Sequence, residues 1–502
     1  MRREAFITEI VPELGRHDLL PAIIFRTSRN QCDVDVDQAG SSRVLKLAPP
    51  AQREFHSVVK DVMRRYEMDE ELITTHPHYS ALITTGVGAH HAGQLLMWRL
   101  LLEELMAGGV LRVLVATGTV AAGVDFPART VVITAHSRRG AEGFASLTAA
   151  ELQQMSGRAG RRGKDTVGFC LVAPAPFCDA RTVLRISKRP PEPLQSAYFP
   201  GPSTVLNLLR YRNVDDLRFT VSRSLAAFTD RKAGAQIIRE AEAVEERLSP
   251  EEREATRHAE EENEAPESAP QHGGQQGGGH DARERRREGK KLVKRVRRLR
   301  RQAAEMAARQ EVLLEAALQG LQKLGYVEGS SLSKKGYWAA NLCTSVVLEL
   351  GEIIEAKFLD NVSPEKLAAM VASISGDEHR QYLEVDRDSL TKDEVRRLSE
   401  VIQRVTSSGM PGVSDNRKVL LAAANTVSEW LRAENWQQFR GILQLSGVAE
   451  GDAARLITQT AEQLNQLGRL METHPELALK AEDVKRRIMR PPLTEVINFE
   501  SL

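Results

Sequence analysis

"VLVATGTVAAGVDFPARTVVI", residues 113–133, joins two short β-branched runs through a loop that contains glycine. The runs 113–117 and 131–134 have the length and composition of buried strands. Two further runs of this kind stand at 22–25 and 167–172, and helical stretches separate them. Strands and helices that alternate in this way predict an α/β fold, with a parallel sheet covered by helices on both faces.

Ligands of such open parallel sheets bind beyond the carboxyl ends of the strands. Thr117 closes one predicted strand, and Ser28 and Arg29 follow another. The apolar stretch 93–109, closed by two glycines, is typical of a covering helix. The sequence therefore predicts a binding site near Thr117, Ser28 and Arg29.

Composition limits the class of protein. The 502 residues are 41% hydrophobic, enough for two to four domains, and a formal charge of +1 gives no overall bias towards polyanions. The four cysteines form no CxxC pair and have no histidine at zinc spacing, so we predict no metal site and reduced, mostly buried thiols of an intracellular protein. The sequence predicts no membrane span and no signal peptide.

The second half of the chain changes character along its length. Residues 203–248 look helical, and residues 240–267 carry twelve acidic residues against three basic ones. A glycine-rich stretch follows, so we predict a disordered linker over 249–283. Residues 283–301 then carry twelve Lys or Arg against two Glu, and amphipathic helices are expected onward to Leu502.

A second stretch, "QMSGRAGRRGKD" (154–165), carries three arginines and three glycines. Thr148 and Glu151 have the spacing of a capping box that opens the preceding helix. If that helix continues, Gln154, Arg158 and Arg161 share one face. Guanidinium groups suit phosphate oxygens, although an exposed basic turn is the alternative interpretation.

This stretch resembles motif VI of superfamily-two DExH-box helicases, in the superkiller/antiviral branch that includes exosome-associated RNA helicases. Other segments agree in order and spacing. They resemble motif IV ("PAIIFRTSRNQCD", 21–33), the His-His-Ala-Gly element of the branch ("GVGAHHAG", 86–93), motif V (113–133) and the segment after the second motor lobe ("EPLQSAYFPGPSTVLNLLRY", 192–211).

The resemblance implies a domain order. After a leader (1–20) it implies a second RecA-like lobe (21–180), the start of a winged-helix region (195–248), the remainder of that region after a basic helix (284–340), and a helical ratchet domain (341–502). The fold class implied is therefore a RecA-like α/β lobe followed by a mostly α-helical region with a winged-helix part and a helical bundle. No pattern of an arch-like β insertion is visible between them.

The resemblance also implies a nucleotide site. Arg158 and Arg161 match the arginine fingers, and Gln154, Gly123 and Asp125 match positions near the nucleotide, although Asp125 is alternatively a cap of the "DFP" turn. ATP and Mg²⁺ would be held mainly by a first lobe, and the sequence contains neither G-x-x-x-x-G-K-[ST] nor a strand-borne DExH motif. We therefore expect the C-terminal part of a helicase that does not hydrolyse ATP alone.

The implied nucleic-acid contacts are spread over the chain: Ser28, Arg29, His90, His91, Gly93, Thr117, Arg455 and Gln459. A purely structural role is the alternative for both histidines. In the helix 450–470, Arg455 and Gln459 would face the bound nucleic-acid strand, while Leu456 and Leu464 would face the protein core. An ordinary amphipathic bundle helix is the alternative interpretation there.

Two classes of function follow. The first is part of an ATP-dependent RNA helicase that acts on single-stranded or 3′-overhang RNA, in an RNA-processing or RNA-decay complex. The second is an ATP-independent nucleic-acid-binding adaptor, and a DNA helicase fragment is a further alternative. The basic run 283–301 has three interpretations: an RNA contact, a nuclear address or a solvated helix face.

Overall fold

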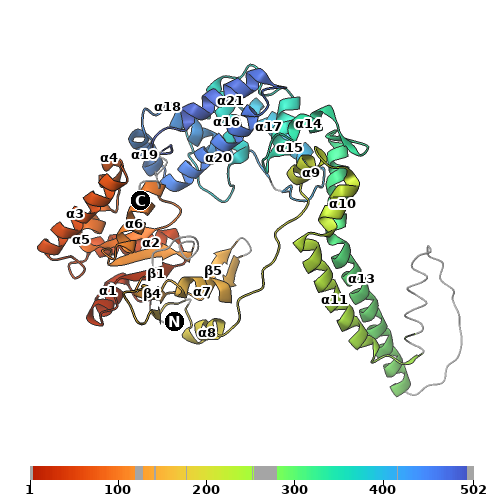
Figure 1. Ribbon diagram of the computed structural model, residues 1–502, viewed down its shortest axis with the longest axis horizontal. Helices are drawn as coiled ribbons and strands as arrows, with labels where there is room; N and C mark the ends of the chain where they lie inside the picture. Colours follow the sequence, from red (N-terminus) through yellow and green to blue (C-terminus); the bar gives the residue numbers. More distant parts are fainter. Residues whose placement is uncertain are drawn as a thin grey trace.

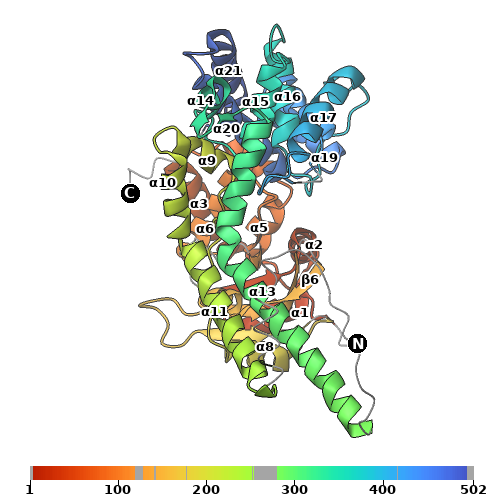
Figure 2. The same cartoon turned by 90° about the vertical axis from the view of Figure 1, so that its right-hand side faces the viewer.

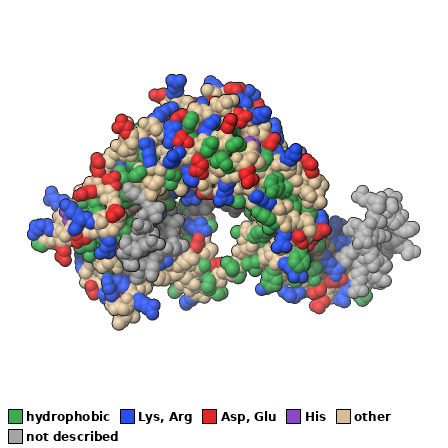
Figure 3. Space-filling view, turned by 45° about the horizontal axis from the view of Figure 1, so that its top comes forward, with side chains coloured by type: hydrophobic (Ala, Val, Ile, Leu, Met, Phe, Trp, Pro, Cys, Tyr) green, Lys and Arg blue, Asp and Glu red, His purple; other side chains and the backbone are tan. Residues whose placement is uncertain are grey.

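The computed structural model describes residues 4–118, 128–140, 143–176, 178–250, 253, 280–414 and 417–494. An α/β lobe forms one end of an arc, a helical domain forms its middle, and a long helical hairpin projects from the other end (Figure 1). The space-filling view shows an open hollow between the lobe and the hairpin, beneath the helical domain (Figure 3).

The lobe contains a five-stranded parallel sheet of order β2-β3-β1-β4-β7. This confirms the α/β prediction and the four predicted strands within one or two residues. The strands are β1 (Ala22–Arg26), β2 (Val87–His90), β3 (Val113–Thr117), β4 (Thr130–Ile133) and β7 (Phe169–Val172). An antiparallel hairpin of β5 (Ser137–Gly140) and β6 (Gly143–Ser146) stands apart from the sheet.

Helices cover both faces of the sheet because its strands are apolar on both sides. Ile23 and Phe25 of β1 pack into one core, whereas Ala22 and Ile24 pack into the core on the opposite face. The helices of the lobe are α1 (Ile7–Arg16), α2 (Arg29–Ser41), α3 (Pro49–Arg65), α4 (Glu70–Thr74), α5 (Tyr79–Thr85), α6 (Leu96–Ala107), α7 (Ala149–Ser156) and α8 (Ala180–Ser187).

The rest of the described chain is mostly helical, as predicted, and one large hydrophobic core unites most of it. Its elements are α9 (Pro202–Leu209), α10 (Val214–Ser222), α11 (Leu225–Glu245), α13 (His280–Lys323), β8 (Val327–Glu328), β9 (Ser331–Leu332), α14 (Lys334–Ala339), α15 (Val347–Glu355), α16 (Pro364–Ser375), α17 (Lys392–Thr406), α18 (Leu421–Arg432), α19 (Trp436–Leu445), α20 (Glu450–Gly468) and α21 (Pro475–Ile488).

Two predictions need correction. Cys32 and Cys178 are buried, but Cys170 and Cys343 are exposed, so the thiols are not mostly buried. The predicted linker 249–283 falls largely outside the described residues, and its last four residues belong to α13.

Within the described part of the chain, no helix combines the length and apolar character that crossing a membrane requires.

Candidate nucleotide and nucleic-acid sites

The candidate residues lie at two opposite edges of the sheet. Ser28 and Arg29 follow β1, His90 ends β2 and Thr117 ends β3, which brings these residues to the carboxyl edge. The segment 157–165, which we call the arginine loop, reaches the other edge, because Ala128, just before β4, donates its N–H to Arg158 O at 2.9 Å. The structure therefore separates the nucleic-acid candidates from the two arginines.

The arginine loop begins earlier than the sequence suggested. Thr148 and Glu151 form the predicted capping box, but α7 ends at Ser156 with Gly157 as its C-cap. Gly160 and Gly163 then adopt positive φ angles of 95° and 78°, which glycine tolerates best. The expectation of a continuing helix is wrong, because α7 ends at its C-cap Gly157, before the first arginine, and Gly160 and Gly163 turn the chain after it.

Arg161 is held by an acidic residue of the same loop. Its Nε and Nη2 donate to the two carboxylate oxygens of Asp165 at 2.8 and 2.9 Å, and its backbone N–H donates to the same carboxylate. The Asp165 side chain is only 2% exposed, and the Arg129 guanidinium lies 3.7 Å away. This pair fixes the loop and leaves Nη1 of Arg161 outside the pair, while Arg158 is half-buried.

The Arg161–Asp165 pair predicts a pH dependence of stability. Hydrogen bonds from Arg161 lower the pKa of the Asp165 carboxyl from 3.8 to about 2. A carboxyl with a lowered folded-state pKa contributes stability above its unfolded pKa and loses it as the pH falls. We expect Asp165→Asn to lower the free energy of unfolding at neutral pH, and the difference from the parent to shrink between about pH 4 and pH 2.

Urea unfolding across this pH range measures that difference. Asp61→Asn is the matched control, since Asp61 forms an exposed ion pair with Arg64 in α3. An Asp165→Asn deficit that does not change with pH would contradict the assigned role of the carboxylate.

Gln154 lies apart from the arginines. It lines an opening of about 380 Å³ together with Thr117, Thr27 and residues of the β4–α7 segment. The predicted common face of Gln154, Arg158 and Arg161 is therefore wrong, and Gln154 shares its surroundings with a predicted nucleic-acid residue. Gly123 and Asp125 lie outside the described residues.

Both histidines of the His-His-Ala-Gly element are buried. His90 Nε2 lies 2.6 Å from Glu103 Oε1, and His91 Nε2 lies 2.8 Å from Asp33 Oδ1. His91 Nδ1 also accepts the N–H of Gly93 at 3.2 Å. These contacts favour the alternative in which both histidines hold the loop in shape.

The loop after β2 docks on the helical domain. Gly451, near the start of α20, donates its N–H to Gly93 O at 3.0 Å, and a Cβ on Gly451 would lie 2.5 Å from Ala92 O. Arg29 Nη1 donates to Asp452 Oδ2 at 2.6 Å. Arg29 therefore joins the lobe to α20, and Ser28 caps α2 through its side chain.

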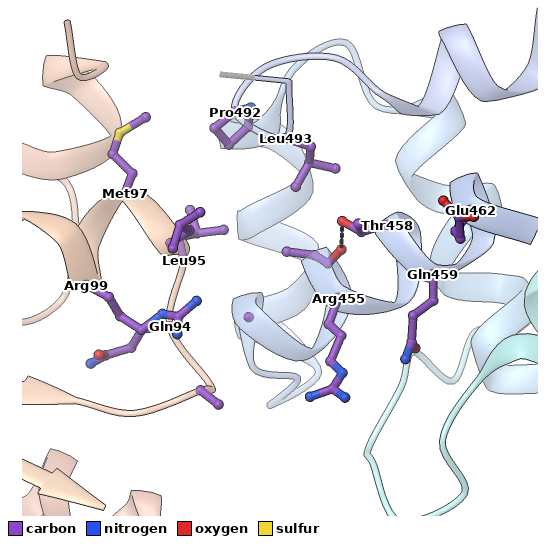
Figure 4. Close-up of a pocket in the computed structure, with 14 residues that line it drawn as sticks. Gln94, Leu95, Met97, Arg99, Arg455, Thr458, Gln459, Glu462, Pro492 and Leu493 are labelled. Atoms are coloured by element: carbon purple, nitrogen blue, oxygen red, sulfur yellow. Dashed lines mark hydrogen bonds between the residues drawn. The ribbon is translucent and has the colours of Figure 1, made fainter. Parts of the chain in front are cut away.

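A pocket of about 610 Å³ lies between this loop and α20 (Figure 4). Arg455, Thr458 and Gln459 line it from α20, and Gln94 and Arg99 line it from the lobe. Arg455 is exposed, while Leu456 and Leu464 are fully buried as predicted, and Leu467 is buried beside them. Arg455 and Gln459, which the sequence analysis assigned to contact with a nucleic-acid strand, therefore border an open pocket at the junction.

Gln94 is a candidate that the sequence analysis missed. Its side chain is 6% exposed, and neither amide atom has a hydrogen-bond partner among the described residues. A buried amide without partners is costly, which suggests that a polar ligand completes it. Its position directly after Gly93 was an available signal.

Comparison with known proteins agrees with this architecture. Residues 78–163 match the family described as "Helicase conserved C-terminal domain", and residues 329–495 match "DSHCT (NUC185) domain". Superkiller complex protein 2 of Homo sapiens is 34% identical over 221 residues, which is 42% of this chain and 17% of that protein.

Two microbial proteins show similar matches. The probable helicase HelY of Mycobacterium tuberculosis (strain ATCC 25618 / H37Rv) is 31% identical over 232 residues, 46% of this chain and 26% of that protein. Antiviral helicase SKI2 of Saccharomyces cerevisiae is 31% identical over 204 residues, 40% of this chain and 16% of that protein. The matched part thus spans about a quarter or less of each relative. The two matched domains and these relatives support the assignment of the chain as a C-terminal part of a Ski2-like DExH helicase.

Proposed function

We propose that this chain provides the second motor lobe and the strand-contacting helical domain of an ATP-dependent RNA helicase. The observation that carries the proposal is the pocket between the loop after β2 and α20. It combines an exposed guanidinium (Arg455), two amides (Gln94 and Gln459) and a second arginine (Arg99). Such groups suit phosphates and base edges of a single strand.

The arginine loop supports the motor part of the proposal only in part. Arg158 is half-buried at the edge of the sheet, where it could meet a triphosphate held by another lobe. Arg161 has two nitrogens bound to Asp165, so only its Nη1 would serve as a phosphate donor. ATP and Mg²⁺ would supply the energy of the cycle, and this chain would contribute transition-state charge from Arg158.

A second surface is consistent with a further lobe. Several large apolar side chains are exposed along 211–228, with Tyr211, Phe219 and Phe228 exposed by 77%, 57% and 56%. In the space-filling view, hydrophobic side chains also gather on the hairpin side of the hollow (Figure 3). Contiguous exposed apolar surface usually marks an interaction site. We propose that a nucleotide-binding lobe covers this surface.

The second candidate function is ATP-independent nucleic-acid binding. The Arg161–Asp165 pair favours it, because a guanidinium that already holds a carboxylate serves the loop without any nucleotide. Superkiller complex protein 2 is named for a complex. By analogy we propose that either function is carried out in an RNA-decay or RNA-processing complex.

Binding of RNA with a single-stranded 3′ overhang tests whether the Arg455 pocket is a site for a single nucleic-acid strand, which we call the strand site. We expect Arg455→Glu to weaken binding by roughly 10- to 150-fold, since a charge-assisted hydrogen bond to phosphate is worth about 1.5–3 kcal/mol. Fluorescence anisotropy of a labelled RNA measures the dissociation constant. A matched DNA strand compares the two nucleic acids.

The matched control is Arg469→Glu. Arg469 is exposed at the C-terminal end of the same helix, about 21 Å away at 1.5 Å per residue. If both variants bind RNA with the same reduced affinity, general charge rather than the pocket attracts RNA, and the strand site is wrong.

A further inference from the structure

The hairpin of α11 and α13 projects from the helical domain (Figures 1 and 2). Its two helices share a small apolar core in which Ala241, Val244 and Leu248 meet Val296 and Leu299. Ion pairs flank this core, with Arg295 to Glu240 at 2.9 Å and Arg300 to Glu245 at 2.6 Å. The apolar face of α13 and part of its charge are therefore used to hold the hairpin together.

The outward face of α13 is basic. Five exposed side chains, spaced three or four residues apart, form one row that we call the basic stripe: Arg287, Lys290, Lys294, Arg298 and Arg301. Three of them, Lys290, Lys294 and Arg298, form no ion pair with any residue that the structure describes. At 1.5 Å per residue, neighbouring members lie about 6 Å apart and the stripe extends about 21 Å.

The composition of the stripe selects its ligand. A helix that lies in a membrane surface inserts an apolar face, but Val296 and Leu299 are already packed against α11. Protein interfaces are usually anchored by aromatic or apolar side chains, and exposed cations alone supply no such anchor. A dense, regular row of phosphates fits the stripe best, because neutralising phosphates releases condensed counterions.

We propose that the basic stripe binds the phosphate backbone of double-stranded RNA. A rigid row of cations matches the regular phosphates of a duplex, whereas a flexible single strand would have to be ordered first. This site goes beyond the proposed function: it lies on a different element from the Arg455 pocket and needs no ATP. Farther along α13, Leu314, Ala317 and Leu321 are buried in the main core, so a duplex on the stripe is attached rigidly to the body.

A blunt-ended RNA hairpin tests the proposal, because it offers no overhang to the Arg455 pocket. The triple variant Lys290→Gln, Lys294→Gln, Arg298→Gln is expected to bind this hairpin at least tenfold more weakly. The slope of log affinity against log salt concentration should become shallower by roughly 0.9 for each phosphate that the variant no longer neutralises. Binding of the 3′-overhang strand should change much less.

The control removes the same charge elsewhere, through Arg53→Gln, Lys60→Gln, Arg65→Gln on the exposed face of α3. Circular dichroism verifies that both triple variants keep the parent helicity. Equal hairpin affinity of the two triple variants overturns the proposal. Displacement of the RNA by poly-glutamate at equal charge concentration overturns it as well, since the stripe would then serve an acidic protein. Neither result affects the Arg455 pocket, so failure of one site is distinguishable from failure of the other.

Discussion

Replacing Arg158 by alanine is expected to lower ATP turnover by roughly 10³–10⁵-fold once the chain is joined to a nucleotide-binding lobe. An arginine finger stabilises charge on the transferred phosphoryl group, and a loss of this size corresponds to about 4–7 kcal/mol. The experiment fuses the first lobe of a Ski2-like helicase before residue 4 and measures phosphate release with and without RNA. The 502-residue chain alone should show no RNA-stimulated turnover, because its sequence contains no Walker A lysine.

Arg162→Ala is the matched control for this prediction. Arg162 is an exposed arginine in the same loop, so its removal changes the loop charge equally. It should retain most of the turnover of the parent fusion. If Arg158→Ala and Arg162→Ala behave alike, Arg158 has no special access to the nucleotide, and the adaptor function becomes the better interpretation.

Arg161 needs a different treatment because it has a structural partner. Arg161→Ala would remove the two side-chain hydrogen bonds to the carboxylate of Asp165 and leave only the one from the backbone N–H of residue 161. The loop would therefore lose stability whatever the nucleotide does. Arg161→Lys keeps a charge but cannot form the bidentate contact. A variant at Arg161 therefore reports on the finger only when the free energy of unfolding is measured beside turnover.

Much of the lobe could be predicted because its signals are local. The β-branched runs at 22–25 and 113–117 are continuous and apolar, and they form β1 and β3 as expected. β2 escaped prediction because Gly88 interrupts a strand of four residues. The common face of Gln154 and Arg158 also failed, since helical spacing cannot be extended through Gly157.

Long-range pairings were beyond prediction for a different reason. Arg29 and Asp452 are separated by 423 positions, and the sequence around either residue contains no signal that the two form a pair. Asp165 stands only four residues after Arg161 in the quoted motif. The two side chains meet because the chain turns between them, with a positive φ at Gly163, and the sequence pattern did not indicate this turn. Sequence patterns thus identified the types of group, while tertiary packing decided which groups were left to meet a ligand.

Replacing Arg440 by alanine is expected to loosen the junction between the lobe and the helical domain by about 3–5 kcal/mol. Arg440 lies on α19 and is only 4% exposed. Its Nη1 donates to Thr75 Oγ1 at 2.8 Å and its Nη2 to Leu72 O at 3.1 Å, both in the lobe. Its Nε lies 2.9 Å from Glu450 Oε1, at the start of α20.

The size of this effect follows from what remains after the substitution. Glu450 would keep the hydrogen bond from Trp436 Nε1 at 2.8 Å but would lose its buried cation. The carbonyl of Leu72 would lose a donor in a site too enclosed for easy hydration, and truncation would leave a cavity. Hydrogen–deuterium exchange should therefore rise in α4 and in the first turn of α20. Arg432→Ala is the matched control, since Arg432 forms an exposed pair with Glu429 within α18.

Arg440→Lys separates charge from geometry at the same position. Lysine retains the cation for Glu450 but cannot reach Thr75 and Leu72 with a planar fork. If exchange rises to an intermediate level at α4 while α20 stays protected, the hydrogen bonds of the Arg440 guanidinium to Thr75 and Leu72 hold the lobe against the helical domain. If Arg440→Ala leaves both elements protected, the other contacts across the junction are sufficient to hold it. They include the Arg29–Asp452 pair, the Gly93–Gly451 hydrogen bond and the packing of Leu72 and Leu95 in the main core. The Arg455 pocket, which lies between the same two bodies, would then depend on those remaining contacts for its shape.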